Sequence, residues 1–246
     1  MVFERYAEYY DIIYSNKDYD AETSYLDELL AHFGRPKSIL DLGCGTGEYM
    51  IRLQKFGYAV SGIDISKEMI TQARKKGVLS TWRADMRKFH LGSYFDCCIC
   101  MFGGIGYLNN IHDFVRTLEC VGEHLEPNGI FVFDYWNGLA VLMQMPEVRD
   151  RKIDMGDLVL LRTARPKLKL EEQICEVHYT CSVKRGDQCV DEFEEIHPLR
   201  FYFPGEIHLA LNTAGFDHLA TYPFMKHEGA PDGESWNVIT IARRMA

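Results

Sequence analysis

The chain has 246 residues, of which 47% are hydrophobic, and this suits one α/β domain or one domain with an insertion. Its formal net charge of −9 lacks the basic character of a general nucleic-acid binder, so we expect no nucleic-acid partner. The opening MVFERYAEYYDIIY does not have the pattern of a secretory signal, and no apolar run is long enough to span a bilayer. The eight cysteines form no zinc-type pairs, so we expect reduced, buried thiols, a cytoplasmic protein and no metal site.

The first half of the chain alternates helical and strand patterns, beginning with an amphipathic helix over 20–34 and the buried strand SILDL at 38–42. Further helices are expected over 47–57, 66–77 and 111–125. Further strands are expected over 58–64, 78–85, 94–102 and 129–136. This alternation predicts a parallel sheet with right-handed crossovers and helices on both faces.

The pattern changes near Val148, where strand-like segments follow one another without helices between them. They cover 157–170, 171–185 and 188–203. The sequence Lys184-Arg185-Gly186-Asp187 is a hairpin signal between the last two. A helix over 204–216 and strands over 216–224 and 236–244 then return to the main sheet.

This pattern predicts how the chain is divided. We expect an antiparallel β insertion over 146–202 within a main body formed by 1–145 and 203–246. The first 34 residues or so form a helical cap on that body. The apolar strands of the insertion are expected to serve as a lid and as the interface of a homodimer.

The first strand runs into DLGCGTG, an acid followed by three glycines, directly before a helix. Ligands bind at the carboxyl ends of the strands in an open parallel sheet, so we expect this turn to face one. A dinucleotide fingerprint would need a third glycine where this chain has Glu48. Asp41 and Glu48 also disfavour a pyrophosphate and favour a zwitterionic or cationic ligand.

These motifs resemble those of class I S-adenosylmethionine-dependent methyltransferases, whose first motif reads like LDLGCGTG. The resemblance implies S-adenosylmethionine as cofactor and a Rossmann-like, seven-stranded, mostly parallel sheet with one antiparallel strand. It implies that Asp64 of GIDIS binds the ribose hydroxyls and that Asp85 of RADMR contacts the adenine. The expected cofactor contacts are Tyr14, Asp41, Gly43, Cys44, Gly45, Asp64, Ile65, Met69, Asp85, Met86 and Met101.

The segment YYDIIYSNKDYDAET is similar to a narrower group that includes the N,N-dimethyltransferases of aminosugar biosynthesis. This resemblance implies methyl transfer to a small molecule, an amine first of all, by in-line displacement at the sulfonium methyl. It implies catalytic contacts from Tyr14, which closes over the cofactor, and from His124, a proton acceptor. Substrate contacts are expected from Tyr107, Trp136 and His227.

Several alternatives stay open at this point. One alternative is that the methyl group goes to an oxygen atom, and another is that the acceptor is a macromolecule. A third is that the chain is a non-catalytic subunit that binds S-adenosylmethionine. His124 also has a purely structural interpretation, since an imidazole stabilises a helix C-terminus. The loop GGIGY after the fourth strand differs from the Asn/Asp-Pro-Pro-Tyr loop of enzymes that methylate DNA or glutamine amino groups.

Overall fold

The computed structural model describes residues 2–245, which contain a seven-stranded sheet in the order β10-β11-β5-β4-β1-β2-β3. Its strands are β1 (Ser38–Leu42), β2 (Ala59–Asp64), β3 (Thr81–Arg83), β4 (Phe95–Cys100), β5 (Leu125–Trp136), β10 (Phe216–Pro223) and β11 (Asn237–Arg244). Neighbours among β1–β5 pair in parallel. Strand β11 is antiparallel to both β5 and β10. The predicted Rossmann-like sheet with one antiparallel strand is confirmed.

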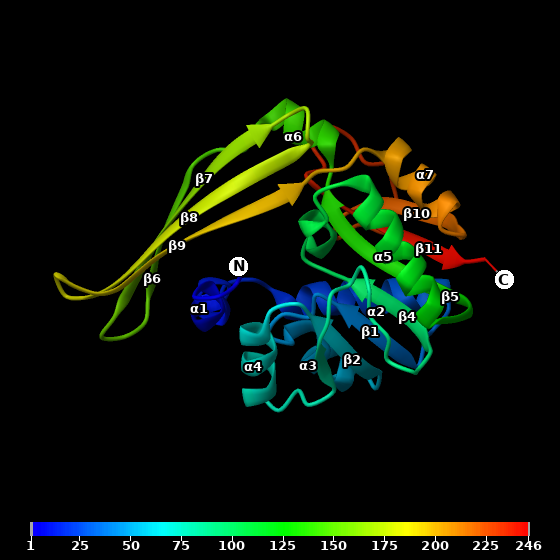
Figure 1. Ribbon diagram of the computed structural model, residues 1–246, viewed down its shortest axis with the longest axis horizontal. Helices are drawn as coiled ribbons and strands as arrows, with labels where there is room; N and C mark the ends of the chain where they lie inside the picture. Colours follow the sequence, from blue (N-terminus) through cyan, green and yellow to red (C-terminus); the bar gives the residue numbers. More distant parts are fainter. Residues whose placement is uncertain (1, 246) are drawn as a thin grey trace.

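Helices cover both faces of this sheet (Figure 1). One face packs against α2 (Tyr19–Phe33), α3 (Glu48–Lys55) and α4 (Lys67–Lys75), and the other against α5 (Ile111–His124) and α7 (Pro204–Thr213). Alternation along the strands separates the two cores, because successive side chains point to opposite faces. Cys97 and Ile99 lie in the first core, and Cys98 and Cys100 lie in the second.

The second sheet is antiparallel and projects from the body (Figure 1). It contains β6 (Arg149–Asp154), β7 (Val159–Lys169), β8 (Ile174–Arg185) and β9 (Gln188–Arg200), in that order. The predicted hairpin is present, because only Gly186 and Asp187 separate β8 from β9, with Gly186 at a φ of 58°. These strands fall within the predicted insertion, whose division from the main body stays a prediction.

Two elements were not expected from the sequence. Strand β6 has the sequence RDRKID, and its charges suit an exposed edge strand but hide the apolar alternation that marks a buried one. Helix α6 (Gly138–Gln144) is short and follows β5 directly. Some strand boundaries also differ from those expected: β3 is shorter, and β5 begins at Leu125, where its pairing with β4 has an irregularity between Phe95 and Cys97.

The cap helix α1 (Tyr6–Ile13) lies beside the second sheet and α4 (Figure 1). Tyr6 and Ile13 are buried in a cluster with Leu160 of β7 and Cys181 of β8. The amides of Phe3 and Tyr6 donate to the carboxylate of Glu195 on β9, at 2.8 and 2.9 Å. The cap therefore connects the main body to the second sheet.

All eight cysteines are free thiols, and seven of them are buried as expected. Cys189, on the exposed part of β9, is the exception. Within residues 2–245, every helix is too short or too polar to cross a membrane.

Candidate active site

A cavity of about 480 Å³ lies at the carboxyl ends of β1, β2, β4 and β5 and is also lined by the cap and the second sheet. Its volume falls in the range of small-ligand sites. It brings together most of the residues proposed from the sequence: Tyr14, Asp41, Gly43, Cys44, Gly45, Asp64, Ile65, Met69, Asp85, Met86, Met101, Tyr107 and Trp136.

The glycine turn presents bare backbone to this cavity. Gly43, Gly45 and Gly47 have φ values of 70°, 53° and 81°, which side chains other than glycine rarely adopt. A Cβ added at Gly43 would lie 3.5 Å from Met86 Cε, and one at Gly47 would lie 3.1 Å from Val78 Cγ2. The turn therefore needs glycine for its torsions, and at Gly47 also because Val78 packs closely against it.

Two buried acids lie against the turn. Asp64 is 8% exposed and accepts hydrogen bonds from the amides of Gly45 and Ser66, at 2.9 and 2.8 Å. Asp41 is 2% exposed, and its Oδ2 has no hydrogen-bond partner among the residues that the structure describes. Burial, helped by the charge of Asp64, holds the pKa of Asp41 well above its ordinary value. An unpaired buried oxygen is costly, so this acid indicates a donor or a cation that a ligand supplies.

Asp85 differs from the other two acids. Its carboxylate forms a bidentate pair with Arg87, which also contacts Asp113. The hydrogen bonds from Arg87 hold the pKa of Asp85 below its ordinary value. Asp85 lines the cavity as an ionised, already paired group, and Arg87 fixes the position of the carboxylate proposed to face the adenine.

A further acid of the cavity, Asp134, was not identified from the sequence. It lies near the carboxyl end of β5, is 4% exposed, and its Oδ1 accepts from the amide of Gly103 at 2.9 Å. Burial raises the pKa of Asp134 to about 7. The rule that pointed to Asp41 and Asp64, an acid at the end of a buried strand, also applies to VFDYW and would have found it.

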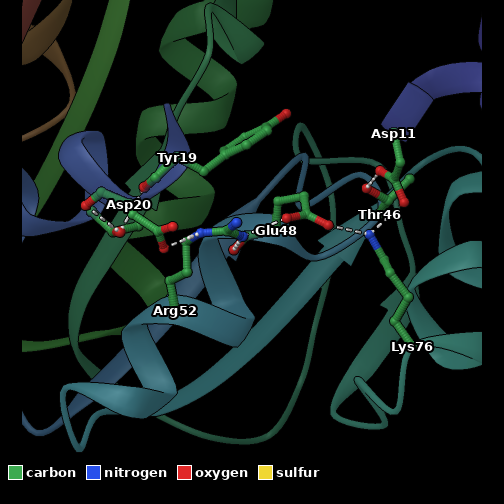
Figure 2. Close-up of polar contacts among 8 residues, drawn as sticks. Asp11, Tyr19, Asp20, Thr46, Glu48, Arg52 and Lys76 are labelled. Carbon is green, nitrogen blue, oxygen red and sulfur yellow. Dashed lines mark hydrogen bonds and ion pairs between the residues drawn. The ribbon is translucent and has the colours of Figure 1, made fainter. Parts of the chain in front are cut away.

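The cap is held onto the glycine turn by polar contacts (Figure 2). Asp11 of α1 accepts a hydrogen bond from Thr46 at 2.5 Å and pairs with Lys76 at 2.7 Å. Lys76 also pairs with Glu48 at 2.6 Å, and Glu48 contacts Arg52. Through this network, which we call the cap clamp (Asp11, Thr46, Glu48, Lys76), the N-terminal segment covers one side of the cavity.

Aromatic side chains complete the wall next to the cap. Tyr14 packs edge-on against Phe102 with ring centroids 5.1 Å apart. Further aromatic residues of the lining, which no motif singled out, are Phe3, Tyr19, Tyr49, Tyr179 and His197. They lie in stretches of mixed polar and apolar residues, such as KDYDAE around Tyr19, where nothing local distinguishes a cavity position from a core or surface position.

Two predicted residues lie outside the cavity lining that the structure describes. His124 is 3% exposed, with Nδ1 2.8 Å from the carbonyl of Cys120 and Nε2 accepting from the amide of Leu91 at 3.2 Å. Both ring nitrogens are occupied by backbone, so the prediction of a proton acceptor at His124 is wrong and the structural interpretation holds. His227 pairs with Glu28 at 2.9 Å on the surface and does not reach the cavity.

The residues present fit S-adenosylmethionine. Asp64 keeps lone pairs for ribose hydroxyls, Asp85 and Met86 lie where the adenine is expected, and the glycine turn leaves room for the amino-acid part. The oxygen of Asp41 lacks a partner, and burial raises the pKa of Asp134, so a positively charged ligand would stabilise the ionised form of both acids.

Comparisons with known proteins agree with this fit. Residues 39–129 match the family model described as a methyltransferase domain. The dTDP-3-amino-3,4,6-trideoxy-alpha-D-glucopyranose N,N-dimethyltransferase of Streptomyces venezuelae is 29% identical over 221 residues, which cover 85% of this chain and 89% of the relative. The dTDP-3-amino-3,6-dideoxy-alpha-D-glucopyranose N,N-dimethyltransferase of Streptomyces fradiae is 29% identical over 219 residues, covering 85% and 82%.

Solved structures show the same fold. DesVI of Streptomyces venezuelae matches with a TM-score of 0.81 at 23% identity over 98% of both chains. An S-adenosylmethionine-dependent methyltransferase from Clostridium acetobutylicum matches with a TM-score of 0.81 at 19% identity over 97% of both chains. With the glycine turn and its buried acids, these likenesses show a methyltransferase domain over residues 39–129, in a chain whose fold is that of S-adenosylmethionine-dependent methyltransferases.

Proposed function

We propose that this methyltransferase acts on a small-molecule amine, with the amino group of a nucleotide-linked sugar as the first candidate. The observation that carries the proposal is the acidic lining of the cavity. Asp41, Asp64 and Asp134 are all buried there, and burial raises the pKa of each. Such a lining favours a positively charged sulfonium and a positively charged ammonium group over a carboxylate as the reacting group of the acceptor.

The relatives support the same acceptor class. Both relatives from Streptomyces are named as N,N-dimethyltransferases of dTDP-linked aminosugars, and they align over 85% of this chain. We propose the same kind of acceptor, the amino group of a sugar, for this protein, because its cavity is lined by charged and aromatic side chains.

S-adenosylmethionine, when bound, supplies an electrophilic methyl group on a positively charged sulfur. The task of this chain is then to hold the acceptor nitrogen in line with that methyl group and to exclude water, which accounts for most of the acceleration of such displacements. The cap clamp covers the side proposed for the cofactor, and Phe102, Tyr14 and Trp136 are aromatic residues of the cavity lining. Aromatic faces stabilise cations through their quadrupoles.

The experiment is a product-detecting assay with three acceptor panels. It offers dTDP-aminosugars, simple primary and secondary amines, and matched compounds that carry hydroxyl or carboxylate groups. We expect N-methylated and N,N-dimethylated products from the amines, detected by mass spectrometry, and none from Asp64→Ala. Methylation of hydroxyl or carboxylate acceptors alone, with cofactor binding intact, would contradict the amine proposal.

We also propose that the second sheet acts as a lid and as a homodimer interface. Strand β9 is an edge strand and exposes Val190 and Ile196, which are 43% and 51% accessible. Light scattering at several protein concentrations tests the dimer.

A further inference from the structure

Three polar side chains form a line from the cavity into the second sheet. Tyr107, at the end of the 3₁₀ turn η1 (Gly104–Tyr107), lines the cavity. Its hydroxyl lies 2.8 Å from Nδ1 of His197 on β9, and Nε2 of His197 lies 3.1 Å from Oε2 of Glu195. His197 is 1% exposed and the side chain of Glu195 is 7% exposed, so water does not compete for these contacts.

The protons on this line can be assigned from Glu195. Burial alone would raise the pKa of Glu195, but hydrogen bonds from His197 and from the amides of Tyr6 and Phe3 outweigh burial and hold that pKa below its ordinary value. Glu195 is therefore an ionised carboxylate, which only accepts hydrogen bonds. In a neutral imidazole, the proton must then lie on Nε2, which leaves Nδ1 to accept the hydroxyl proton of Tyr107.

We propose that Tyr107 is the catalytic group that takes the proton from the acceptor amine, and that His197 and Glu195 position and activate it. The proposal rests on the amine acceptor proposed above. The ammonium gives one proton to the oxygen of Tyr107, and the hydroxyl proton of Tyr107 passes to Nδ1 of His197. The tyrosine stays neutral, the imidazole becomes an imidazolium beside Glu195, and the nitrogen lone pair becomes free.

The methyl transfer follows this proton transfer. The freed lone pair forms the new N–C bond as the C–S bond breaks, and the sulfur keeps that electron pair. The proton held on His197 returns through Tyr107 to water after product release. Proton transfer by a positioned base contributes about 10²- to 10⁴-fold to a rate.

Glu195 favours an imidazolium at His197, because its carboxylate lies 3.1 Å from Nε2. Arg162 of β7 is a cation that opposes it from farther away, with its guanidinium carbon 5.2 Å from the ring centroid of Tyr179, which in turn lies 4.9 Å from that of His197. Burial holds the pKa of Tyr107 well above its ordinary value, so this residue relays protons and does not ionise on its own. The titratable groups facing the relay from the packed elements are Tyr6, Tyr10, Tyr14, Asp64, Arg162, Tyr179 and Glu195.

Other groups of the cavity suit this role less well. The hydroxyl of Tyr49 donates to Glu22, but the carboxylate of Glu22 is already paired with Lys17. The hydroxyl of Tyr14 lies 3.4 Å from that of Tyr6, which leads to Arg162 and not to a base. Asp134 attracts the ammonium, and its Oδ1 is held by the amide of Gly103.

The first test uses the protein without ligands. Nitrogen-15 NMR of labelled histidines should show His197 protonated on Nε2, and Tyr107→Phe should shift the Nδ1 resonance because its hydrogen bond is lost. A His197 protonated on Nδ1, or a Nδ1 resonance that Tyr107→Phe leaves unchanged, overturns the proposal whatever the acceptor is.

The second test follows kcat against pH with saturating ligands. At pH 7, Tyr107→Phe and His197→Gln should each lower kcat by about 100-fold, and the double variant should be no slower. The deficit should shrink by about tenfold per pH unit as the amine loses its proton in solution. Equal pH profiles for wild type and Tyr107→Phe, or a pH-dependent deficit in Asp134→Asn instead, would overturn the relay.

Asp191→Asn is the matched control. Asp191 on β9 accepts from Tyr9 at 2.8 Å and pairs with Arg5, so it ties the same cap to the same strand without touching His197. It should keep the pH profile of the wild type. If the wild type methylates no amine, the amine proposal fails, and the NMR result still decides the hydrogen-bonded line. If the wild type methylates amines and Tyr107→Phe is equally active, only the proposed relay fails.

Discussion

The two sides of the cavity differ in what they are made of. On the cofactor side, the wall is a backbone turn with buried carboxylates, carried by the ends of adjacent strands of one rigid sheet. On the opposite side, which we propose faces the acceptor, the wall consists of side chains from η1 and the second sheet, and the cap borders both sides. Tyr107 and His197 are 90 residues apart in the chain, and Phe3 and Glu195 are 192 apart.

This difference predicts two kinds of behaviour. Changes on the cofactor side should alter binding of S-adenosylmethionine, since its contacts are short-range and preformed. Changes on the acceptor side should alter turnover and its pH dependence while cofactor binding stays intact. The Tyr107 and His197 variants described above test the acceptor side, and the variants below test the cofactor side, the buried acid Asp134 and the cap.

The largest effect on binding should come from Asp64→Ala. Asp64 is expected to hold two ribose hydroxyls and also fixes the amide of Gly45, so we expect cofactor affinity to fall by about 2–3 kcal/mol. Calorimetry measures the change. Asp85→Asn should cost less, because Arg87 already satisfies that carboxylate. Equal affinities for wild type and Asp64→Ala would remove Asp64 from the cofactor site.

A smaller effect should appear in the stability of Asp134→Asn. The pKa of Asp134 is raised from its ordinary value of 3.8 to about 7 in the folded protein, so the folded state binds this proton more tightly than the unfolded state. This carboxyl therefore makes the ligand-free protein less stable as pH rises from about 4 to about 7, after which its effect is constant.

The asparagine variant lacks this titration. Its melting temperature should match that of the wild type more closely at pH 5 and exceed it at pH 8. Thermal melts at the two pH values provide the measurement. A wild-type advantage that grows with pH would show that Asp134 is stabilised as a carboxylate by groups other than the ligands.

The smallest effect should come from the cap clamp. Asp11→Asn keeps the hydrogen bond to Thr46 but loses the charge opposite Lys76, and partly exposed ion pairs of this kind contribute about 1 kcal/mol or less. We expect the cofactor to dissociate a few-fold faster, with the difference disappearing at high salt.

The control for the clamp is Asp20→Asn, which removes an exposed partner of Arg52 away from α1. It should leave the dissociation rate unchanged, and stopped-flow fluorescence can follow both variants. A salt-independent effect of Asp11→Asn would assign Asp11 a direct contact with the cofactor instead of a clamp contact.

The sequence was most informative where function depends on a local pattern. The glycine turn, Asp64 and Asp85 each sit within one motif at one strand end, and a single window contains the reason for their position. Class I topology, its antiparallel strand and the hairpin at Gly186 followed from the same kind of local signal, together with the family resemblance.

The relay shows where such reasoning stops. In EEIHPL, Glu195 and His197 are two residues apart, so they lie on the same face of the strand, and this spacing is visible in the sequence. Nothing local shows that this face meets Tyr107, because the contact depends on how the second sheet returns to the main body. His124 shows the opposite error. The family resemblance suggested a role for it in the site, but both of its ring nitrogens contact backbone groups, the carbonyl of Cys120 and the amide of Leu91.

Helix α1 is anchored at both ends, by Asp11 on the glycine turn and by the amide of Tyr6 on Glu195. Lifting this helix off the cavity therefore requires both contacts to break, one to the main body and one to the second sheet. A shift of the second sheet would thereby be transmitted to the cover over the glycine turn.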